Sequence, residues 1–481
     1  MGVLPSGPMH LSNALRASAH RTIEADYLVV GAGAMGMAFT DTIVSETDTT
    51  VVLVDRGHQP GGHWITAYPF VRLHQPSAFY GVNSRKLGSG VIDAVGWNQG
   101  LYELATGAEI CAYYDQVMQQ QLLPTGRVRY FPMSEYHGDG RFTTLAGDDY
   151  AVTCQSVVDA TYMRTIVPSM RPPEYAIADE IDCVPPNDLP KCAVGKERYV
   201  IVGAGKTGID VCLWLLRQGV SPDLLTWIVP RDAWLLDRAS LQPGSGWTAI
   251  PARVEAMRQA TSVDDLFDRL EAAGALLRLD PAVQPTMYRC ATVTRAELEQ
   301  LRRIKDVVRS GHVKAIERRK ILLEGGEIPT GAATLHIDCS ADGAVRGAAT
   351  AVFDGDRITL QSVRGCQQAF SAALIAHVET TRDDAAVKNE LCTPVPHPDS
   401  HLDWLRLAIA DNRNQMRWQE DPELATWLDT CRLDLVAGQR PPMPGSPRVR
   451  ERALRLIKAT LEAANDRLEA LLSSTGDICE I

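Results

Sequence analysis

Two stretches of the chain share one pattern of apolar and polar positions. In each, a short β-branched run, Tyr27–Val30 or Tyr199–Val202, leads into G-x-G-x-x-G and then into a helical pattern. In the second copy, Ile209, Leu213 and Leu216 recur at the spacing of one helix face. The pattern predicts two strand–turn–helix units, each the start of a parallel sheet.

Both glycine motifs have the chemistry of a dinucleotide site. The first glycine permits a tight turn, the second lets the backbone approach a pyrophosphate, and the third lets the helix pack closely on the strand. The pyrophosphate then lies at the positive end of the helix. The expected contacts are Gly31, Gly33, Ala34, Met35 and Gly36 in the first unit, and Gly203, Gly205, Lys206, Thr207 and Gly208 in the second. Two dinucleotides are therefore expected.

The residues that follow the second strand of each unit distinguish the nucleotides. In the first unit Val51–Val54 runs into Asp55 and Arg56, and a carboxylate there binds the ribose hydroxyls of FAD or NAD and repels a 2′-phosphate. In the second unit the strand runs into Pro230 and Arg231, whose guanidinium matches a phosphate dianion and favours NADP(H). The alternative is that Arg231 is a solvated loop residue.

If the first dinucleotide is FAD, a third segment is a candidate for contact with its flavin. A glycine-containing turn leads into a helical pattern with Phe370, Leu374 and Val378 on one face. A helix start aimed at a flavin stabilises negative charge on the reduced ring, so Gln367 and Gln368 are expected near the isoalloxazine. A core helix whose start faces solvent is the alternative.

The expected fold class is α/β, with two Rossmann-like domains for FAD and NADPH and a helical C-terminal region. The expected domains are a flexible extension at 1–23, an FAD-binding domain at 24–170 completed by 331–385, an NAD(P)H-binding domain at 190–330, and helices at 386–481. The last helix, 447–472, carries an apolar stripe that either docks on its own subunit or forms a dimer seam.

Composition limits the classes of function. The 481 residues are 45% hydrophobic and 22% charged, with no apolar run long enough to span a bilayer, so no membrane-embedded protein is expected. The net charge of −11 argues against a nucleic-acid partner. The eleven cysteines include no C-x-x-C pair, so neither a disulfide framework nor a dithiol redox centre is expected, and a reducing cytoplasm fits. No metal site is expected from the histidine spacing.

Beyond the two fingerprints, the segments GGHW (Gly61–Trp64), YPFVRLHQPSAFYGVNSRK (Tyr68–Lys86) and DATYMRTIVPS follow in order before GAGKTGID. This arrangement resembles the class B flavoprotein monooxygenases, which include flavin-containing monooxygenases, N-hydroxylases and Baeyer–Villiger enzymes. The resemblance covers roughly Asp26–Asp232, a little under half of the chain.

The resemblance implies site residues along the flavin. The implied flavin contacts are Gly61, Gly62, Trp64, Arg72, His74 and Gln75, together with Ala160 at the end of the linker strand. Asn83 corresponds to an asparagine whose amide faces the reactive edge of the ring in that family. Asn83 and His74 are thus the expected residues of the reacting centre, although from sequence alone Asn83 equally fits an ordinary turn.

The resemblance implies a monooxygenase in which NADPH reduces FAD and a flavin C4a-(hydro)peroxide oxygenates nitrogen, sulfur or a carbonyl carbon of a small molecule. The expected partners are that substrate and O2, with a homodimer possible. The family's F-x-G-x-x-x-H segment is missing before the second glycine motif. An NADPH-dependent flavoprotein dehydrogenase or oxidase that does not oxygenate its substrate is therefore the alternative, and a nucleotide-binding scaffold is a third.

Overall fold

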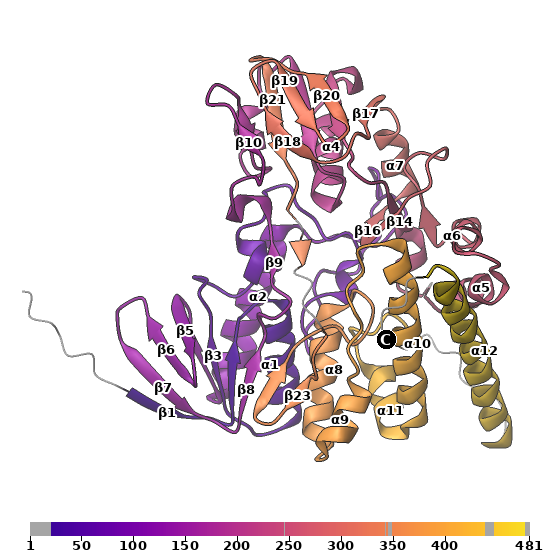
Figure 1. The fold of residues 1–481 in the computed structure, drawn as a ribbon. Coiled ribbons are helices and arrows are strands. Elements are labelled where there is room, and N and C mark those ends of the chain that lie inside the picture. Colours follow the sequence, from indigo (N-terminus) through magenta and orange to yellow (C-terminus); the bar gives the residue numbers. More distant parts are fainter. Residues whose placement is uncertain (1–20, 245, 342, 345–348, 438–446, 477–481) are drawn as a thin grey trace, which may run out of the picture.

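The computed structural model describes residues 21–244, 246–341, 343–344, 349–437 and 447–476 (Figure 1). Two parallel sheets organise it. The strands of the first sheet, from one edge to the other, are β4 (Val128–Phe131), β3 (Val51–Val54), β2 (Tyr27–Val30), β8 (Ser156–Asp159), β24 (Arg357–Thr359) and the antiparallel β23 (Phe353–Asp354). Those of the second are β17 (Asp306–Val308), β13 (Leu225–Ile228), β12 (Arg198–Val202), β21 (Thr334–Asp338) and β11 (Cys183–Val184). The two expected parallel units are confirmed.

Helices cover one face of the first sheet and a small sheet covers the other. The glycine-led helix α1 (Ala34–Glu46) packs against α8 (Gln368–Thr381), and both are almost wholly apolar toward the core. The small sheet consists of β1 (Arg21–Glu24), β7 (Asp149–Thr153), β6 (Arg141–Thr144) and β5 (Ser134–Gly138). Ile23 of β1 is buried with Phe142 and Val152, so residues 21–23 are ordered strand and not part of a flexible extension; residues 1–20 lie outside the described part.

The second unit repeats this layering. One face of its sheet packs on α4 (Lys206–Arg217) and α7 (Arg295–Leu301), with the short α3 (Leu189–Cys192) beside them. The other face packs on β18 (Val313–Ile316) and β19 (Lys320–Leu323), which pair with β10 (Ala176–Ile177) and β20 (Gly326–Pro329). Because Thr334–Asp338 is the strand that returns from this hairpin to the second sheet, the expectation that 331–385 completes the first domain is wrong for this strand. Only the later part, β23, β24 and α8, returns to the first unit.

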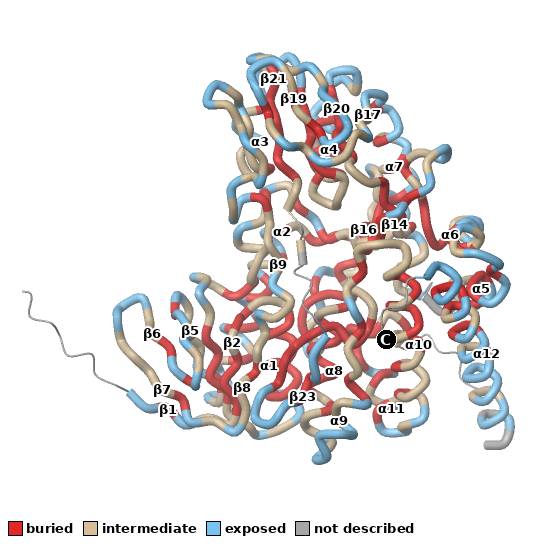
Figure 2. Tube along the Cα trace, viewed as in Figure 1, coloured by how far each residue is buried: buried red, intermediate tan, exposed pale blue. Residues whose placement is uncertain are grey.

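The sequence did not predict that a third group of elements would pack together, although it predicted helices in the region 386–481. A three-stranded sheet of β15 (Leu276–Leu277), β14 (Ala233–Asp237) and β16 (Met287–Val293) packs with α5 (Gly246–Gln259), α6 (Val263–Ala272), α10 (His401–Glu420) and α12 (Pro447–Ser474). The remaining helices are α2 (Gly107–Val117), α9 (Ala385–Leu391) and α11 (Pro422–Thr430). Figure 2 shows buried backbone concentrated along the sheets and in α8.

The last helix docks on its own chain through one half of its apolar stripe. Ala464, Leu468 and Leu471 are buried against α5 and α10, whereas Leu456 and Ile457 are exposed. The docked arrangement is therefore confirmed for the C-terminal half of α12, and a homodimer stays a prediction. Among the described residues, no helix combines the length and apolar character that crossing a membrane requires.

A buried ion pair ties the start of α8 to the segment after α11. The Arg364 guanidinium lies 2.7 Å from the Asp434 carboxylate, and both side chains are at most 9% exposed. We expect Asp434→Ala to lower the free energy of unfolding by about 3–5 kcal/mol, because it leaves a buried guanidinium without its counter-charge. Denaturant unfolding followed by circular dichroism measures this loss. The matched change at the exposed Lys320–Glu327 pair, Glu327→Gln, should leave the midpoint unchanged; equal midpoints for the two variants would contradict the prediction.

Candidate functional site

Both glycine turns bring a helix start against the end of a central strand. A Cβ on Gly36 would collide with the Gly31 carbonyl oxygen, and one on Gly208 would collide with that of Gly203. Gly31 and Gly203 have φ values of 106° and 117°, which side chains disfavour. The first and third glycines of each motif therefore have the roles that the sequence predicted for them.

Among the helices of seven or more residues whose N-caps the structure describes, three begin without a side-chain cap; the four-residue α3 also lacks one. Helices α1, α4 and α8 begin after Gly33, Gly205 and Gln367 without a side-chain cap and without an acidic residue in the first turn. By contrast, α2, α6, α7, α9, α10 and α11 are capped by the side chains of Thr106, Ser262, Thr294, Asp384, Ser400 and Asp421. The three uncapped starts are those that the sequence assigned to cofactors, and their free N–H groups suit anionic or electron-rich ligand groups.

The Asp55 carboxylate is held at the first glycine turn. It accepts hydrogen bonds from the backbone N–H groups of Ala32 and Gly57. Its neighbour Arg56 is exposed, and Met35 is buried in α1. Ala160 follows β8 and packs against the glycine turn. A Cβ on Gly36 would lie 3.1 Å from the Ala160 methyl group. The fixed position of Asp55 suits a ribose ligand.

The GGHW segment crosses directly over the first glycine turn. The Gly61 N–H donates to the Ala32 carbonyl at 2.9 Å, and a Cβ on Gly62 would lie 2.9 Å from the Gly33 Cα. The Trp64 indole N–H donates to the Tyr80 hydroxyl at 2.6 Å. Burial raises the pKa of Tyr80 to about 12, so this hydroxyl stays protonated.

The unpaired amide oxygen of Gln367 favours a ligand at the start of α8. Its side chain is 8% exposed, and its Oε1 atom is buried without a hydrogen-bond partner. A buried amide oxygen without a partner is costly, so a donor group of a ligand would stabilise this site. Gln368, the first residue of α8, is half-buried beside it. This orphaned acceptor and the open start of α8 fit the electron-rich edge and ring N–H of an isoalloxazine.

The second glycine turn meets the first unit through Tyr68. The Tyr68 hydroxyl donates to Asp210 at 2.7 Å, and Asp210 also pairs with Lys206 at the start of α4. Thr207 also interacts with Tyr68. The Phe70 ring stacks on Trp214 of α4 at 5.2 Å between centroids. The Tyr68–Phe70 part of the Y-P-x-x-R-L segment therefore contacts the second unit.

Arg231 lies just after β13, where the sequence placed it, but it has a partner. Its guanidinium lies 2.8 Å from Asp399, and Arg289 lies 2.6 Å from the other oxygen of the same carboxylate. These two hydrogen bonds and charges outweigh burial and lower the pKa of Asp399 to about 2. The pair of guanidiniums carries a surplus positive charge that a 2′-phosphate could share.

His74 is influenced by one cation of the second unit, Lys206, and by one that follows β14 of the third group, Arg238. The Arg238 Nε–H donates to the His74 carbonyl at 3.0 Å, and the Lys206 ammonium also acts on its ring. Burial, and after it the charges of Lys206 and Arg238, lower the pKa of His74 to about 3. Arg238 itself is buried against Asn98 and Glu297, so it is a structural residue.

Asn83 has a structural partner. Its Oδ1 accepts the backbone N–H of Arg432 at 3.0 Å, while the Arg432 guanidinium donates to the carbonyls of Ala78, Tyr80 and Val82. Asn83 thus belongs to a turn held by the segment after α11, and its catalytic role stays a prediction. Of the other implied flavin residues, Arg72 is exposed beside the capped start of α2, and Gln75 is half-buried.

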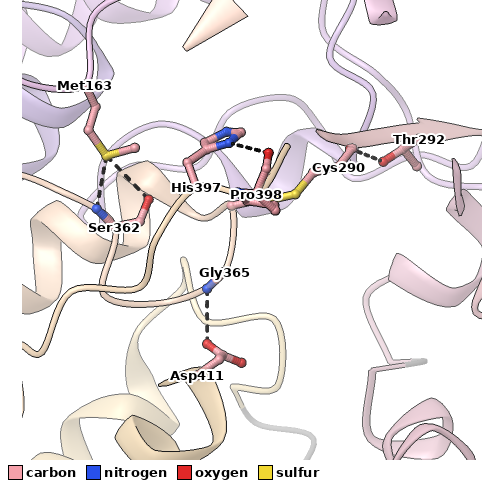
Figure 3. Close-up of a disulfide and its surroundings, with 9 residues drawn as sticks. Met163, Cys290, Thr292, Ser362, Gly365, His397, Pro398 and Asp411 are labelled. Atoms are coloured by element: carbon pink, nitrogen blue, oxygen red, sulfur yellow. Dashed lines mark hydrogen bonds between the residues drawn. A yellow bond between two sulfur atoms is a disulfide. The ribbon is translucent and has the colours of Figure 1, made fainter. Parts of the chain in front are cut away.

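A disulfide between Cys290 and Cys366 joins β16 to the turn before α8 (Figure 3). The sequence predicted no disulfide framework, and it did not reveal this single bond. The two residues are 76 positions apart, and only the third group of elements, which the sequence pattern did not reveal, brings them together. The sequence of strand β16 has no spacing that indicates a partner for Cys290.

The neutral state of His74 makes stability depend on pH. The folded chain binds a proton on this ring only near pH 3, whereas an unfolded histidine binds one near pH 6.5, so acid favours unfolding. We expect the free energy of unfolding to fall by about 1–2 kcal/mol between pH 7 and pH 5 through His74 alone. The His74→Gln variant should lack this fall in the free energy of unfolding, which denaturant titrations at pH 7 and pH 5 measure. Replacing the exposed His137 by Gln is the control; identical slopes for wild type and His74→Gln would contradict the prediction.

Several known structures resemble the chain at low identity, and no family model matches it. A flavin-containing monooxygenase from Stenotrophomonas maltophilia is 15% identical, with 72% of this chain and 88% of that chain covered and a TM-score of 0.39. A cyclohexanone monooxygenase from Rhodococcus sp. Phi1 bound to NADP+ is 13% identical (95% and 98% covered, TM-score 0.45). An oxidized steroid monooxygenase bound to NADP is 15% identical (93% and 98% covered, TM-score 0.46).

Close relatives occur in mycobacteria. The uncharacterized proteins Rv2000 of Mycobacterium tuberculosis and Mb2023 of Mycobacterium bovis are each 62% identical over 460 residues, which covers 94% of this chain and 86% of theirs. At this identity over almost its whole length, the chain belongs to the same protein family as these mycobacterial proteins.

Proposed function

We propose that the chain is an FAD- and NADPH-dependent oxidoreductase, and that it acts as a monooxygenase on a small molecule. The observation that carries this proposal is the pair of uncapped helix starts behind glycine turns, each at the end of a parallel sheet. Asp55 at the first turn favours FAD, and the Arg231–Asp399–Arg289 cluster beside the second favours NADPH. When bound, the flavin supplies hydride acceptance from NADPH and activation of O2.

The residues of the chain bind, orient and enclose these groups. The N–H groups that open α1 and α4 would hold the two diphosphates, and Gln367 and Gln368 would face the isoalloxazine. His74 stays neutral and Tyr80 stays protonated at physiological pH, so both can donate or accept hydrogen bonds without changing charge. The cluster of Trp64, Tyr80 and Tyr114 rings would exclude water from the flavin side.

Oxygenation, as against simple oxidation, rests on the sequence resemblance. The segments GGHW and Tyr68–Lys86 resemble those of class B monooxygenases, whereas the missing F-x-G-x-x-x-H segment favours an oxidase or dehydrogenase. Methyl phenyl sulfide is a suitable probe, because a monooxygenase converts it to the sulfoxide. Sulfoxide formed in proportion to the NADPH consumed supports the monooxygenase; hydrogen peroxide in that proportion, with no sulfoxide, supports the alternative.

The glycine turns allow the two cofactor sites to be separated. We expect Gly36→Ala to weaken FAD binding at least about tenfold, and Gly208→Ala to weaken NADPH binding similarly, because each methyl group displaces a helix start. Flavin absorbance after desalting and calorimetric titration with NADP+ measure the two losses. Gly331→Ala is the matched control, since open space surrounds that glycine. If Gly36→Ala keeps its flavin while folding normally, the FAD assignment is wrong.

Arg231 tests the choice of pyridine nucleotide. We expect Arg231→Ala to raise the KM for NADPH about tenfold and to leave the KM for NADH nearly unchanged, because only NADPH carries the 2′-phosphate. Asp399→Asn should lower the KM for NADPH, since it removes the carboxylate that competes for both guanidiniums. Steady-state kinetics with both nucleotides measures this, with the exposed Arg319→Ala as control. Equal changes for NADPH and NADH would exclude the assignment.

A further inference from the structure

The disulfide links strand β16, which carries Arg289, to the turn before α8, which carries Gln367. Cys290 lies in the middle of β16, and Cys366 directly precedes Gln367 at the start of α8. Their Cα atoms are 6.6 Å apart, within the normal range for such a bond. Figure 3 shows the bond crossing from the strand to the turn. The bond therefore spans two elements that are distant in sequence.

The backbone has an uncommon conformation at both cysteines. Cys290 has φ 56° and Cys366 has φ 55°, conformations that residues other than glycine adopt uncommonly. At Cys290 the pairing of β14 with β16 shifts register, from Trp234 opposite Tyr288 to Leu236 opposite Thr292, which is a β-bulge. Bulges re-aim side chains and are enriched next to functional sites. Strain at both partners points to a functional bond.

The other described cysteines remain thiols. Cys111, Cys154, Cys183 and Cys192 are half-buried, and Cys212, Cys339, Cys392 and Cys431 are buried. Burial raises the pKa of all four buried thiols, which suppresses the reactive thiolate. A chain with this many free thiols is typical of a reducing environment, where a disulfide that persists is usually redox-active.

Accessibility differs between the two sulfurs. Cys290 is 8% exposed, whereas Cys366 is half-buried and stands at the open, positive end of α8. Such a position favours an anionic sulfur, which is the form that reacts with oxidants. Cys366 is therefore the sulfur that an oxidant meets first, and Cys290 is the partner that closes the bond.

The disulfide also lies next to the Arg231–Asp399–Arg289 cluster, which is the proposed NADPH site. Cys290 follows Arg289, whose guanidinium pairs with Asp399, and Asp399 in turn pairs with Arg231. The Tyr288 N–H donates to the Asp399 carbonyl at 2.9 Å, so β16 and Asp399 are also joined through the backbone. Fixing Cys290 to Cys366 thus fixes the strand that keeps both guanidiniums on Asp399.

We propose that Cys290 and Cys366 form a peroxide-responsive thiol–disulfide site that weakens NADPH binding when it is oxidised. The Cys366 thiolate attacks hydrogen peroxide, forms the sulfenic acid and releases hydroxide. The Cys290 thiol then displaces hydroxide from that sulfur, so two thiols and one peroxide give one disulfide and two waters. A dithiol of the thioredoxin class reopens the bond by exchange and is itself oxidised to a disulfide.

The effect on NADPH rests on the proposed function, but the thiol chemistry does not. Full-length protein is reduced with dithiothreitol, desalted, treated or not with hydrogen peroxide, and alkylated with N-ethylmaleimide before digestion. Trypsin places the two cysteines in the peptides Cys290–Arg295 and Gly365–Arg382. The treated sample should contain these peptides linked, and the untreated sample should contain both alkylated. Absence of linked peptides, or a bond that dithiothreitol cannot open in the folded protein, overturns the proposal.

Calorimetric titration of the same two samples with NADP+ tests the consequence. We expect the Kd to be at least about threefold higher in the oxidised protein, a difference that converts to about 0.6 kcal/mol. Cys366→Ser and Cys290→Ser should each bind like the reduced wild type with or without peroxide, and Cys192→Ser should respond like wild type. Equal Kd values for linked and unlinked protein overturn the proposal. Protein that forms the linked peptides but binds neither FAD nor NADP+ contradicts the proposed function and the effect on NADPH, and leaves only the thiol chemistry standing.

Discussion

A close contact between a carbonyl oxygen and the first turn of a helix occurs twice in this chain, and both times only glycine permits it. Gly36 lies against the carbonyl of Gly31, and Gly208 against that of Gly203. These contacts place the starts of α1 and α4 at the ends of β2 and β12. The first N–H groups of both helices have no side-chain cap there. The position of both candidate cofactor sites depends on this approach.

The rest of each unit supports the same geometry. In both sheets the central strand has a strand from the next crossover on one side and a returning strand on the other, and a small sheet covers the face opposite the glycine-led helix. Buried strands such as Val51–Val54 and Arg198–Val202 hold the turns rigidly, because their side chains pack on both faces. Two sites of one design thus arise from two distant parts of the chain.

The sequence predicted those features that depend on residues close together along the chain. The two glycine turns and the helices of the C-terminal region follow from short-range spacing. The strand β17 did not, because Asp306–Val308 continues the polar pattern of α7 and becomes a strand only by pairing with β13. Likewise, the partners of Arg231, Asn83 and Cys290 are Asp399, Arg432 and Cys366, each at least 76 positions away along the chain, where short-range spacing gives no signal.

This third group explains why the C-terminal third of the chain matters for the sites. Helix α10 begins beside Asp399, and the segment after α11 holds Asn83 through Arg432. Through these contacts one stretch of chain touches the Arg231–Asp399–Arg289 cluster and the turn of Asn83 in the first unit. A displacement of β16 would therefore be felt at Arg231 and at the start of α8 together, because Arg289 and Cys290 are adjacent residues of one bulged strand. Each glycine-turn unit has its own sheet and core, and the third group forms a separate core beside them.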